Sequence, residues 1–173
     1  MSKVIIVCGL PGSGKTTLAN ELSRQLNIVC IHKDSIKEIL YEVQNLATLD
    51  DSKIIGSHVI KIVLGLAEEH IRRNVDIIIE SPFNFVENYP IFESWIKNYK
   101  ADVFSVICSI NSKERAKRFI NRERHISHHD AERNYDHFPE KEFDYADMPG
   151  KQIRAETNKS VEELATYIIT NLK

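Results

Sequence analysis

The sequence predicts an α/β domain in which a parallel β-sheet is covered by helices on both faces. Short runs of apolar, mostly β-branched residues recur along the chain, and helical periodicity or helix-capping signals follow them. An uninterrupted apolar run is typical of a strand that is buried on both faces. Strands that alternate with helices imply right-handed crossovers, and therefore a parallel sheet between two helical layers. The 173 residues suffice for one compact domain of this kind.

The first half of the chain is predicted to contain three strands separated by helices. After the first apolar run, Leu18, Leu22 and Leu26 recur on one face of a helix. Ser35 and Glu38 have the spacing of a capping box, which predicts a helix start at that point. The expected elements are a strand at 4–8, a helix at 15–26, a strand at 28–31, a helix from Ser35 to about residue 43, a polar loop at 44–52, a helix from there to residue 73, and a strand at 76–80.

The second half continues the alternation, with one exception. Pro90 suits the first turn of a helix, and Ser160 with Glu163 forms a second capping box. The expected elements are a helix from about 90 to 99, a strand at 103–109, a helix capped by Asn111 or Ser112 that runs to about residue 125, a strand at 152–155, and a helix that Ser160 opens. Residues 126–150 have no clean period. We therefore predict a single domain over residues 1–173, with a lid at about 112–150.

The composition bears on the class of protein and on its location. The net charge is −2, so the chain as a whole has no strong field that would favour DNA, RNA or a membrane as partner. Cys8, Cys30 and Cys108 are odd in number and have no metal-binding spacing, which indicates reduced core thiols. The apolar run before the first glycine is too short for a signal peptide or a membrane span. We expect a cytoplasmic protein, and the sequence shows no apolar stripe that would indicate an oligomer.

A phosphate-binding motif follows the first strand directly. Residues 9–16 read Gly-Leu-Pro-Gly-Ser-Gly-Lys-Thr, which satisfies G-x-x-x-x-G-K-[ST] between a strand and a helix. Its glycines let backbone N–H groups converge on phosphate oxygens, and the next helix directs its positive end at the same anion. Lys15 is expected to reach the β- and γ-phosphates, and the Thr16 hydroxyl to bind Mg²⁺. The predicted nucleotide-binding residues are Gly9, Pro11, Gly12, Ser13, Gly14, Lys15, Thr16 and Thr17.

Carboxylates follow the second and third strands. Asp34 would stand at the catalytic edge of the sheet, where a carboxylate orients an acceptor hydroxyl and takes its proton. The alternative is that Asp34 caps the next helix, although Ser35 fits the capping box better. Glu80 ends the third strand, where it would hold a water of the magnesium shell or contact the substrate. A carboxylate at a strand end also serves solubility alone.

Basic and histidine-rich segments follow the fourth strand. On a helix that continues to about residue 125, Arg115, Arg118 and Arg122 would share one face. Such arginines suit the stabilisation of charge on a transferring phosphoryl group, although a solvated helix face explains some of them. We select Lys15, Asp34, Arg118, Arg122 and Arg124 as catalytic candidates. The four histidines at 125, 128, 129 and 137 indicate a polar lid rather than a zinc site, with packing from Tyr135, Phe138, Phe143 and Tyr145.

With these motifs the chain resembles the small P-loop kinases of the nucleoside-monophosphate-kinase-like class, and among them the AAA_33-type kinases. That branch has relatives among the polynucleotide 5′-hydroxyl kinases, zeta toxins and chloramphenicol phosphotransferases. The resemblance rests on residues 9–17, Lys33-Asp34, residues 77–82 and residues 115–128. It implies the sheet order 2-3-1-4-5, Asp34 as the residue that activates the acceptor, and residues 154–158 beside the adenine. Glu80 stands where this family more often has an aspartate.

The expected function is ATP- and Mg²⁺-dependent transfer of the γ-phosphate to a hydroxyl group of a small molecule, nucleoside or nucleotide. Similarity of fold is a weak guide to the acceptor, because relatives on one scaffold phosphorylate very different molecules. Two alternatives remain open at this point. The first is a 5′-hydroxyl polynucleotide kinase, which would need a basic channel leading to Asp34. The second is an ATPase switch, which would need no carboxylate directed at an acceptor.

Overall fold

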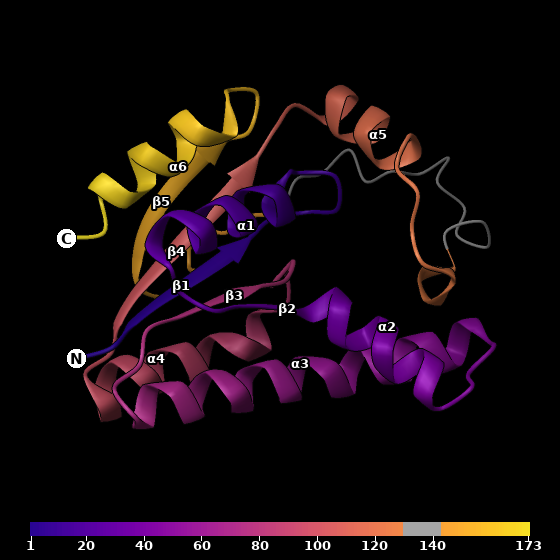
Figure 1. The fold of residues 1–173 in the computed structure, drawn as a ribbon, viewed down its shortest axis with the longest axis horizontal. Coiled ribbons are helices and arrows are strands. Elements are labelled where there is room, and N and C mark those ends of the chain that lie inside the picture. Colours follow the sequence, from indigo (N-terminus) through magenta and orange to yellow (C-terminus); the bar gives the residue numbers. More distant parts are fainter. Residues whose placement is uncertain (130–142) are drawn as a thin grey trace.

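A computed structural model describes residues 1–129 and 143–173, and it confirms the predicted fold class (Figure 1). Most strands and helices lie within two residues of their predicted bounds. The strands are β1 (Lys3–Cys8), β2 (Cys30–His32), β3 (Ile77–Glu80), β4 (Asp102–Ser109) and β5 (Lys151–Glu156). The α-helices are α1 (Lys15–Leu26), α2 (Lys33–Val43), α3 (Leu49–Arg72), α4 (Tyr89–Tyr99), α5 (Ser112–Ile120) and α6 (Val161–Thr170). Short 3₁₀ turns lie at η1 (Val86–Asn88) and η2 (Ile126–His128).

All five strands run parallel in the order β2-β3-β1-β4-β5, as the family resemblance implied. The central strand β1 pairs with β3 on one side and with β4 on the other, so that Val7 faces Glu80 and Val106 in the register. The carboxyl ends of β1, β2, β3 and β4 therefore lie along one edge. This edge is where ligands bind in open parallel sheets.

Two separate cores flank the sheet because successive side chains of a strand point to opposite faces. Val4, Ile6 and Cys8 of β1 pack against α3 and α4 on one face. Ile5 and Val7 pack against α1 and α6 on the other face. Figure 1 shows these two helical layers on either side of the sheet, with α2 and α5 projecting beyond its carboxyl edge. The buried apolar runs thus form a rigid frame that positions the segments at this edge.

Two helix starts differ from their predictions. The helix α2 begins at Lys33 with His32 at the N-cap, so Ser35 lies in its first turn and the predicted capping box is not formed. Asp34 is therefore not the N-cap either. The helix α3 begins at Leu49, inside the segment predicted as a loop. Thr48 and Asp51 make its capping box, with reciprocal bonds between the side chain of each residue and the backbone N–H of the other.

The end of α5 also differs from its prediction. Asn111 caps the helix by accepting a hydrogen bond from the Glu114 N–H, as predicted, but the helix ends at Ile120 rather than near residue 125. Arg122 and Arg124 therefore lie on the segment that leaves the helix. The prediction that Arg122 shares a helical face with Arg115 and Arg118 is wrong.

Three findings bear on the predicted class of protein. Cys8, Cys30 and Cys108 are free thiols that are buried or partly buried. Burial, together with the smaller effect of the Glu80 carboxylate, raises the pKa of Cys30 to about 12. In the part of the chain that the structure describes, no helix is both long enough and apolar enough to cross a bilayer.

The α4 core yields a stability prediction. Phe92 is fully buried, and its ring contacts Phe83 and Trp95 at centroid distances of 5.3 Å each. Phe92→Ala should lower the free energy of unfolding by about 3–5 kcal/mol, because it removes this packing and leaves a cavity. Ile96→Ala is the matched control on the same helix, because Ile96 is 38% exposed, and it should cost less than about 1.5 kcal/mol. Urea denaturation followed by circular dichroism measures both, and equal losses would contradict this packing.

Candidate active site

The phosphate-binding loop has the backbone geometry of an anion cradle. Gly9 and Gly12 have φ angles of 142° and 82°, which other residues rarely adopt. A Cβ atom at Gly12 would lie 2.6 Å from the carbonyl oxygen of Arg115, so a side chain would displace the loop. The helix α1 starts after Gly14 without a side-chain cap. Its first N–H groups are therefore available to an anion.

Lys15 lies in a buried ion-pair network at the ends of β1, β2 and β3. Its Nζ atom is 3.7 Å from Oε1 of Glu80, and both side chains are less than 10% exposed. The other oxygen of Glu80 accepts a hydrogen bond from Nδ1 of His32 at 3.0 Å. Buried charges require partners of this kind. The sequence identified Lys15 and Glu80, whereas His32 was missed, although it ends the strand next to that of Glu80.

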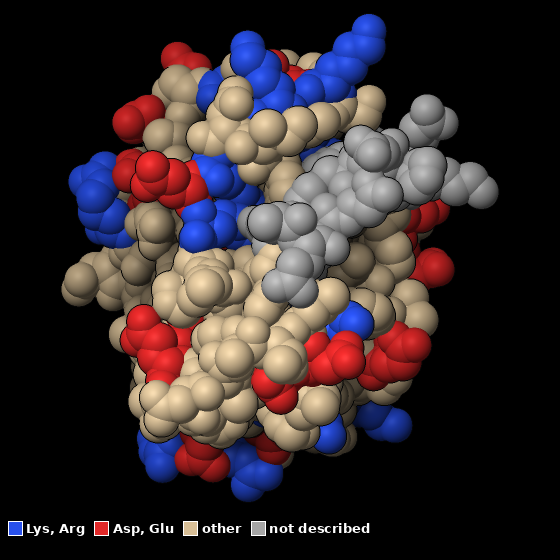
Figure 2. All heavy atoms as spheres, turned by 90° about the vertical axis from the view of Figure 1, so that its right-hand side faces the viewer, with Lys and Arg blue, Asp and Glu red and all other residues tan. Residues whose placement is uncertain are grey.

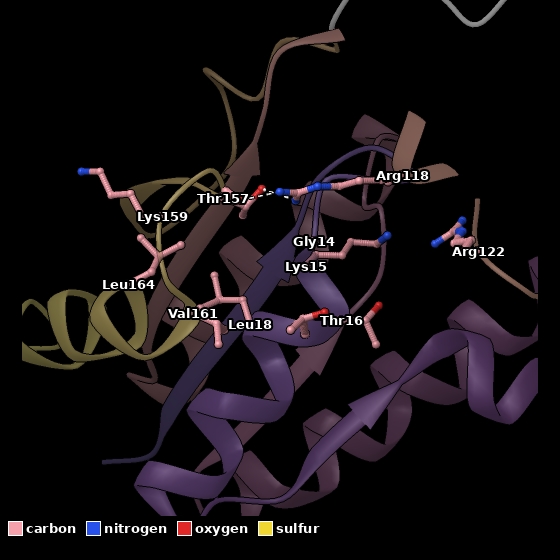
Figure 3. Close-up of a pocket in the computed structure, with 12 residues that line it drawn as sticks. Gly14, Lys15, Thr16, Leu18, Arg118, Arg122, Thr157, Lys159, Val161 and Leu164 are labelled. Carbon is pink, nitrogen blue, oxygen red and sulfur yellow. Dashed lines mark hydrogen bonds between the residues drawn. The ribbon is translucent and has the colours of Figure 1, made fainter. Parts of the chain in front are cut away.

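A cavity of about 410 Å³ extends from the loop toward the ends of β4 and β5. Figure 3 shows Lys15 and Thr16 at this cavity, with Arg118 above them. Arg118 donates a hydrogen bond to the backbone carbonyl of Thr157 at 3.0 Å, which fixes the guanidinium over the loop. The cavity is lined by Gly12, Gly14, Lys15, Thr16, Thr17, Leu18, Arg118, Arg122, Thr157, Lys159, Val161 and Leu164. Thr157 was expected beside the base, whereas Lys159, Val161 and Leu164 were missed.

The basic residues of the α5 segment separate into distinct environments. Arg115 is only 2% exposed and lies beneath the loop, next to Gly12. Arg118 and Arg122 line the nucleotide-sized cavity, and the Arg122 guanidinium stacks on the ring of Phe119 at 4.7 Å. Arg124 instead reaches the first turn of α2, where it binds Asp34. The three predicted arginines therefore do not form a single group on one helix.

Asp34 lies in the first turn of α2 and connects the two sides of the site. Its Oδ2 accepts a hydrogen bond from Arg124 at 3.0 Å, and its Oδ1 is 3.7 Å from Nζ of Lys33. Burial raises the pKa of the Asp34 carboxyl, but the interactions with Lys33, His128, Arg124 and Lys15 outweigh it and hold the pKa below its usual value. The side chain remains 40% exposed. Asp34 is thus an ionised carboxylate that a ligand can reach.

A chain of hydrogen bonds continues from Arg124 into α2. Arg124 donates to Nδ1 of His128 at 2.8 Å, and Nε2 of His128 lies 2.9 Å from Glu38. Because arginine only donates, Nδ1 is the acceptor of the neutral ring, and Nε2 donates to Glu38. Burial lowers the pKa of His128, although Glu38 and Asp34 act in the opposite direction. Neutral His128 therefore holds Arg124 in position beside Asp34.

The other described histidines of this segment also bind α2. Nε2 of His125 is 3.1 Å from Glu42, and Nε2 of His129 is 2.8 Å from the hydroxyl of Tyr41. The lid at about 112–150 stays a prediction, because residues 130–142 lie outside the described part of the chain. In residues 1–129 and 143–173, no three His, Cys, Asp or Glu side chains form a group that could hold a metal ion. Phe143 and Tyr145 pack against each other at 4.7 Å, whereas the predictions for Tyr135, His137 and Phe138 fall outside the described residues.

His128 leads to a prediction about pH dependence. Its pKa is lower in the folded than in the unfolded chain, so its neutral form stabilises the fold fully above pH of about 6.5, and this contribution falls as the pH decreases. Between pH 7.5 and 5.5, the free energy of unfolding of His128→Gln should fall less steeply than that of wild type. The difference in slope should be up to about 1.4 kcal/mol per pH unit. His58→Gln, at an exposed position on α3, is the control. Denaturation at several pH values tests this, and parallel curves for wild type and His128→Gln would contradict it.

Comparisons with known proteins bear on the family and the fold of this chain. The sequence profile of a family described as "AAA domain" (AAA_33) matches residues 4–141. No curated protein matches the sequence. A solved protein of Chloroflexus aurantiacus J-10-fl, described as a "putative kinase", has a TM-score of 0.88 at 19% identity over 99% of both chains.

Two enzymes of known activity share the fold. APS kinase CysC of Mycobacterium tuberculosis, solved with AMPPNP and APS, has a TM-score of 0.66 at 16% identity over 99% of this chain and 96% of the other. Shikimate kinase of Acinetobacter baumannii, solved with shikimate, has a TM-score of 0.59 at 15% identity over 99% and 93%. At such identities the similarity shows the fold. Because the family profile covers most of the sequence, the chain belongs to the AAA_33 family of P-loop kinases.

Proposed function

We propose that this protein is an ATP- and Mg²⁺-dependent kinase that transfers the γ-phosphate to a hydroxyl group of a small molecule. The observation that carries the proposal is the position of Asp34, an accessible ionised carboxylate in the field of Lys15. A hydrolytic switch needs a water-positioning group but no carboxylate beside an acceptor cavity. The kinase neighbours, among them proteins solved with APS and shikimate, support a small acceptor.

The residues of the loop are suited to bind a nucleoside triphosphate. Side chains at Gly9 and Gly12 would clash with the backbone carbonyls of Cys108 and Arg115, so glycine lets the loop keep this conformation. In this proposal the N–H groups of Gly12 and Gly14 bind phosphate oxygens, and Lys15 binds the γ-phosphate. The remaining nucleotide contacts come from Gly9, Pro11, Thr16 and Thr17. The base then lies toward Thr157 and Val161, at the far side of the 410 Å³ cavity.

The magnesium site would be formed by Thr16 and Glu80. A hydroxyl and a carboxylate supply the oxygen ligands that Mg²⁺ prefers, directly or through water. Bound Mg²⁺ neutralises the charge on the phosphates during transfer. Glu80 contacts Lys15 in the structure, so one carboxylate would align both the ammonium group and the metal shell. His32 holds this carboxylate in place through its other oxygen.

Asp34 would orient the acceptor hydroxyl. Phosphoryl transfer passes through a loose transition state, in which the hydroxyl keeps its proton until late in the reaction. A carboxylate with a lowered pKa suits this role, because it must accept a hydrogen bond without itself being protonated at neutral pH. Arg124 fixes its orientation by the 3.0 Å hydrogen bond. Arg122 lies in the wall of the nucleotide cavity, where it would stabilise charge on the transferred group.

The proposal predicts different effects for Lys15 and Asp34. Lys15→Ala should abolish turnover, because it removes the contact with the γ-phosphate. Asp34→Asn should leave ATP affinity within about twofold but slow transfer by about 10²–10⁴-fold, the range of a positioned general base. Asp50→Asn is the control, because the Asp50 side chain is 83% exposed on α3. Titration calorimetry and a coupled ADP assay measure both quantities, and unchanged transfer in Asp34→Asn would remove its proposed role.

Arg118 and Arg122 should differ in the same assays. Arg118→Ala should weaken ATP binding more than it slows transfer, because Arg118 holds Thr157 beside the expected base site. Arg122→Ala should slow transfer at saturating ATP by about 10²-fold or more with a smaller effect on affinity. Single-turnover rates at saturating ATP separate the two effects. The opposite pattern would exchange the roles of the two arginines.

A further inference from the structure

A second cavity lies on the other side of the phosphate-binding loop. It has a volume of about 610 Å³ and opens between α2, α3 and the loop that follows β3. Because β2 and β3 occupy one half of the sheet and β4 and β5 the other, this cavity and the nucleotide-sized cavity flank β1 from opposite sides. Lys33, which contacts Asp34, is part of its wall. An acceptor in this cavity would therefore lie next to Asp34.

The charged side chains in the wall are mostly positive. Among the described residues of the wall, Lys33, Lys37, Lys53 and Lys61 stand against one carboxylate, that of Glu87. This excess is local, because the whole chain has a net charge of −2. Lys53 pairs with Asp50 at 2.9 Å, whereas Lys61 makes no ion pair within the described part of the chain. The cavity thus presents ammonium groups to whatever occupies it.

Lys37 is built into the cavity wall. It is only 3% exposed, although it is a lysine on the first turns of a helix. Its Nζ donates to Oγ of Ser52 at 2.8 Å, and Ser52 in turn donates to the backbone carbonyl of Ser127 at 2.6 Å. These bonds fix the ammonium group and tie α2, α3 and η2 together. A charge held at this depth is pre-organised for a ligand and differs from a mobile surface lysine.

The loop after β3 supplies the apolar part of the wall. Phe83 has a φ angle of 43°, an uncommon conformation for a bulky residue, and its buried ring on Phe92 holds it there. Pro82 accepts a hydrogen bond from the hydroxyl of Tyr145 at 2.7 Å. Strained backbone of this kind concentrates where a loop is positioned for function. Phe85, 65% exposed, adds an aromatic surface to the same wall.

The surroundings of the cavity favour a small anion over a polyanion. Glu38 and Glu42 lie on α2 and Asp50 lies at the start of α3, and these two helices form part of the cavity wall. Figure 2 shows Lys and Arg gathered on the upper part of the face at the carboxyl edge, and several Asp and Glu side chains gathered on the lower part. A nucleic acid that extended beyond the lysines would meet these carboxylates, which repel its phosphates. A compact ligand would meet the lysines alone.

We propose that the phosphoryl acceptor carries an anionic group, a phosphate or a carboxylate, which binds the lysines of this second cavity while its hydroxyl faces Asp34. The inference rests on the proposed kinase function and adds the chemical class of its acceptor. Lys33 and Lys61 supply the charge, Lys37 supplies a fixed donor, and the apolar wall contacts the carbon skeleton. The volume lies within the range of small-molecule sites, which is about 300–1,000 Å³.

Binding measurements without turnover test this assignment. D-ribose, D-ribonate and D-ribose 5-phosphate are titrated into protein saturated with ADP and Mg²⁺, so that the phosphate-binding loop is occupied. The three probes share a five-carbon skeleton and differ in charge, and they distinguish a carboxylate from a phosphate. At least one charged probe should bind at least tenfold more tightly than ribose. Equal affinity for ribose and for both anions would overturn the proposal.

Lysine variants locate the anion. Lys61→Met should weaken the preferred charged probe by about tenfold and leave ribose unchanged, since it removes charge but keeps the apolar stem. Lys33→Met, which also removes a contact with Asp34, should weaken the charged probe by about tenfold more than it weakens ribose. Lys97→Met, at an exposed position of α4, is the control and should change nothing. Circular dichroism verifies that each variant folds. Undiminished anion binding in both cavity variants would overturn the assignment, whereas a failure of phosphoryl transfer in wild type would count against the kinase function alone.

Discussion

The close packing of the phosphate-binding loop against later segments of the chain is the constraint on which the site depends. Gly9 leaves no room for a side chain beside the carbonyl of Cys108 in β4, and Gly12 leaves none beside the carbonyl of Arg115 in α5. Thr157, after β5, donates a hydrogen bond to the carbonyl of Ser13 at 2.7 Å. Segments more than 90 residues apart in the sequence thereby meet at one loop. The cavity beside the loop can form only because these contacts fix its backbone.

The charged side chains at this edge of the sheet form a central pair and a chain of contacts beside it. Lys15 and Glu80 pair at the centre, where burial strengthens each interaction because the local dielectric is low. Arg124 crosses from the segment after α5 to Asp34 on α2 and links the two halves of the sheet edge. Neutral His128 then connects Arg124 to Glu38. The side of the edge at Asp34 is thus held by hydrogen bonds between side chains, whereas the phosphate-binding loop is held by close contacts of its backbone.

The sequence predicts this fold well where local patterns decide it. The apolar strands, the loop motif at residues 9–16 and the Ser160 cap all depend on neighbouring residues, and the structure has them in place. Errors arise at helix ends: α2 begins two residues before Ser35, and α5 ends at Ile120 rather than near residue 125. Contacts between distant residues, such as His32 with Glu80 or Lys37 with Ser52, leave no periodic trace in the sequence. The second cavity depends on such contacts, so sequence motifs do not predict the lysines that line it.

The central claim is that the site delivers a phosphoryl group to an acceptor rather than to water. Incubation with γ-labelled ATP, Mg²⁺ and a pool of neutral and anionic alcohols, followed by chromatography, measures where the label goes. We expect most of the label to appear in an organic acceptor, and we expect free phosphate to form slowly when acceptors are withheld. Label that appears only as free phosphate, at a rate that no acceptor changes, would contradict it.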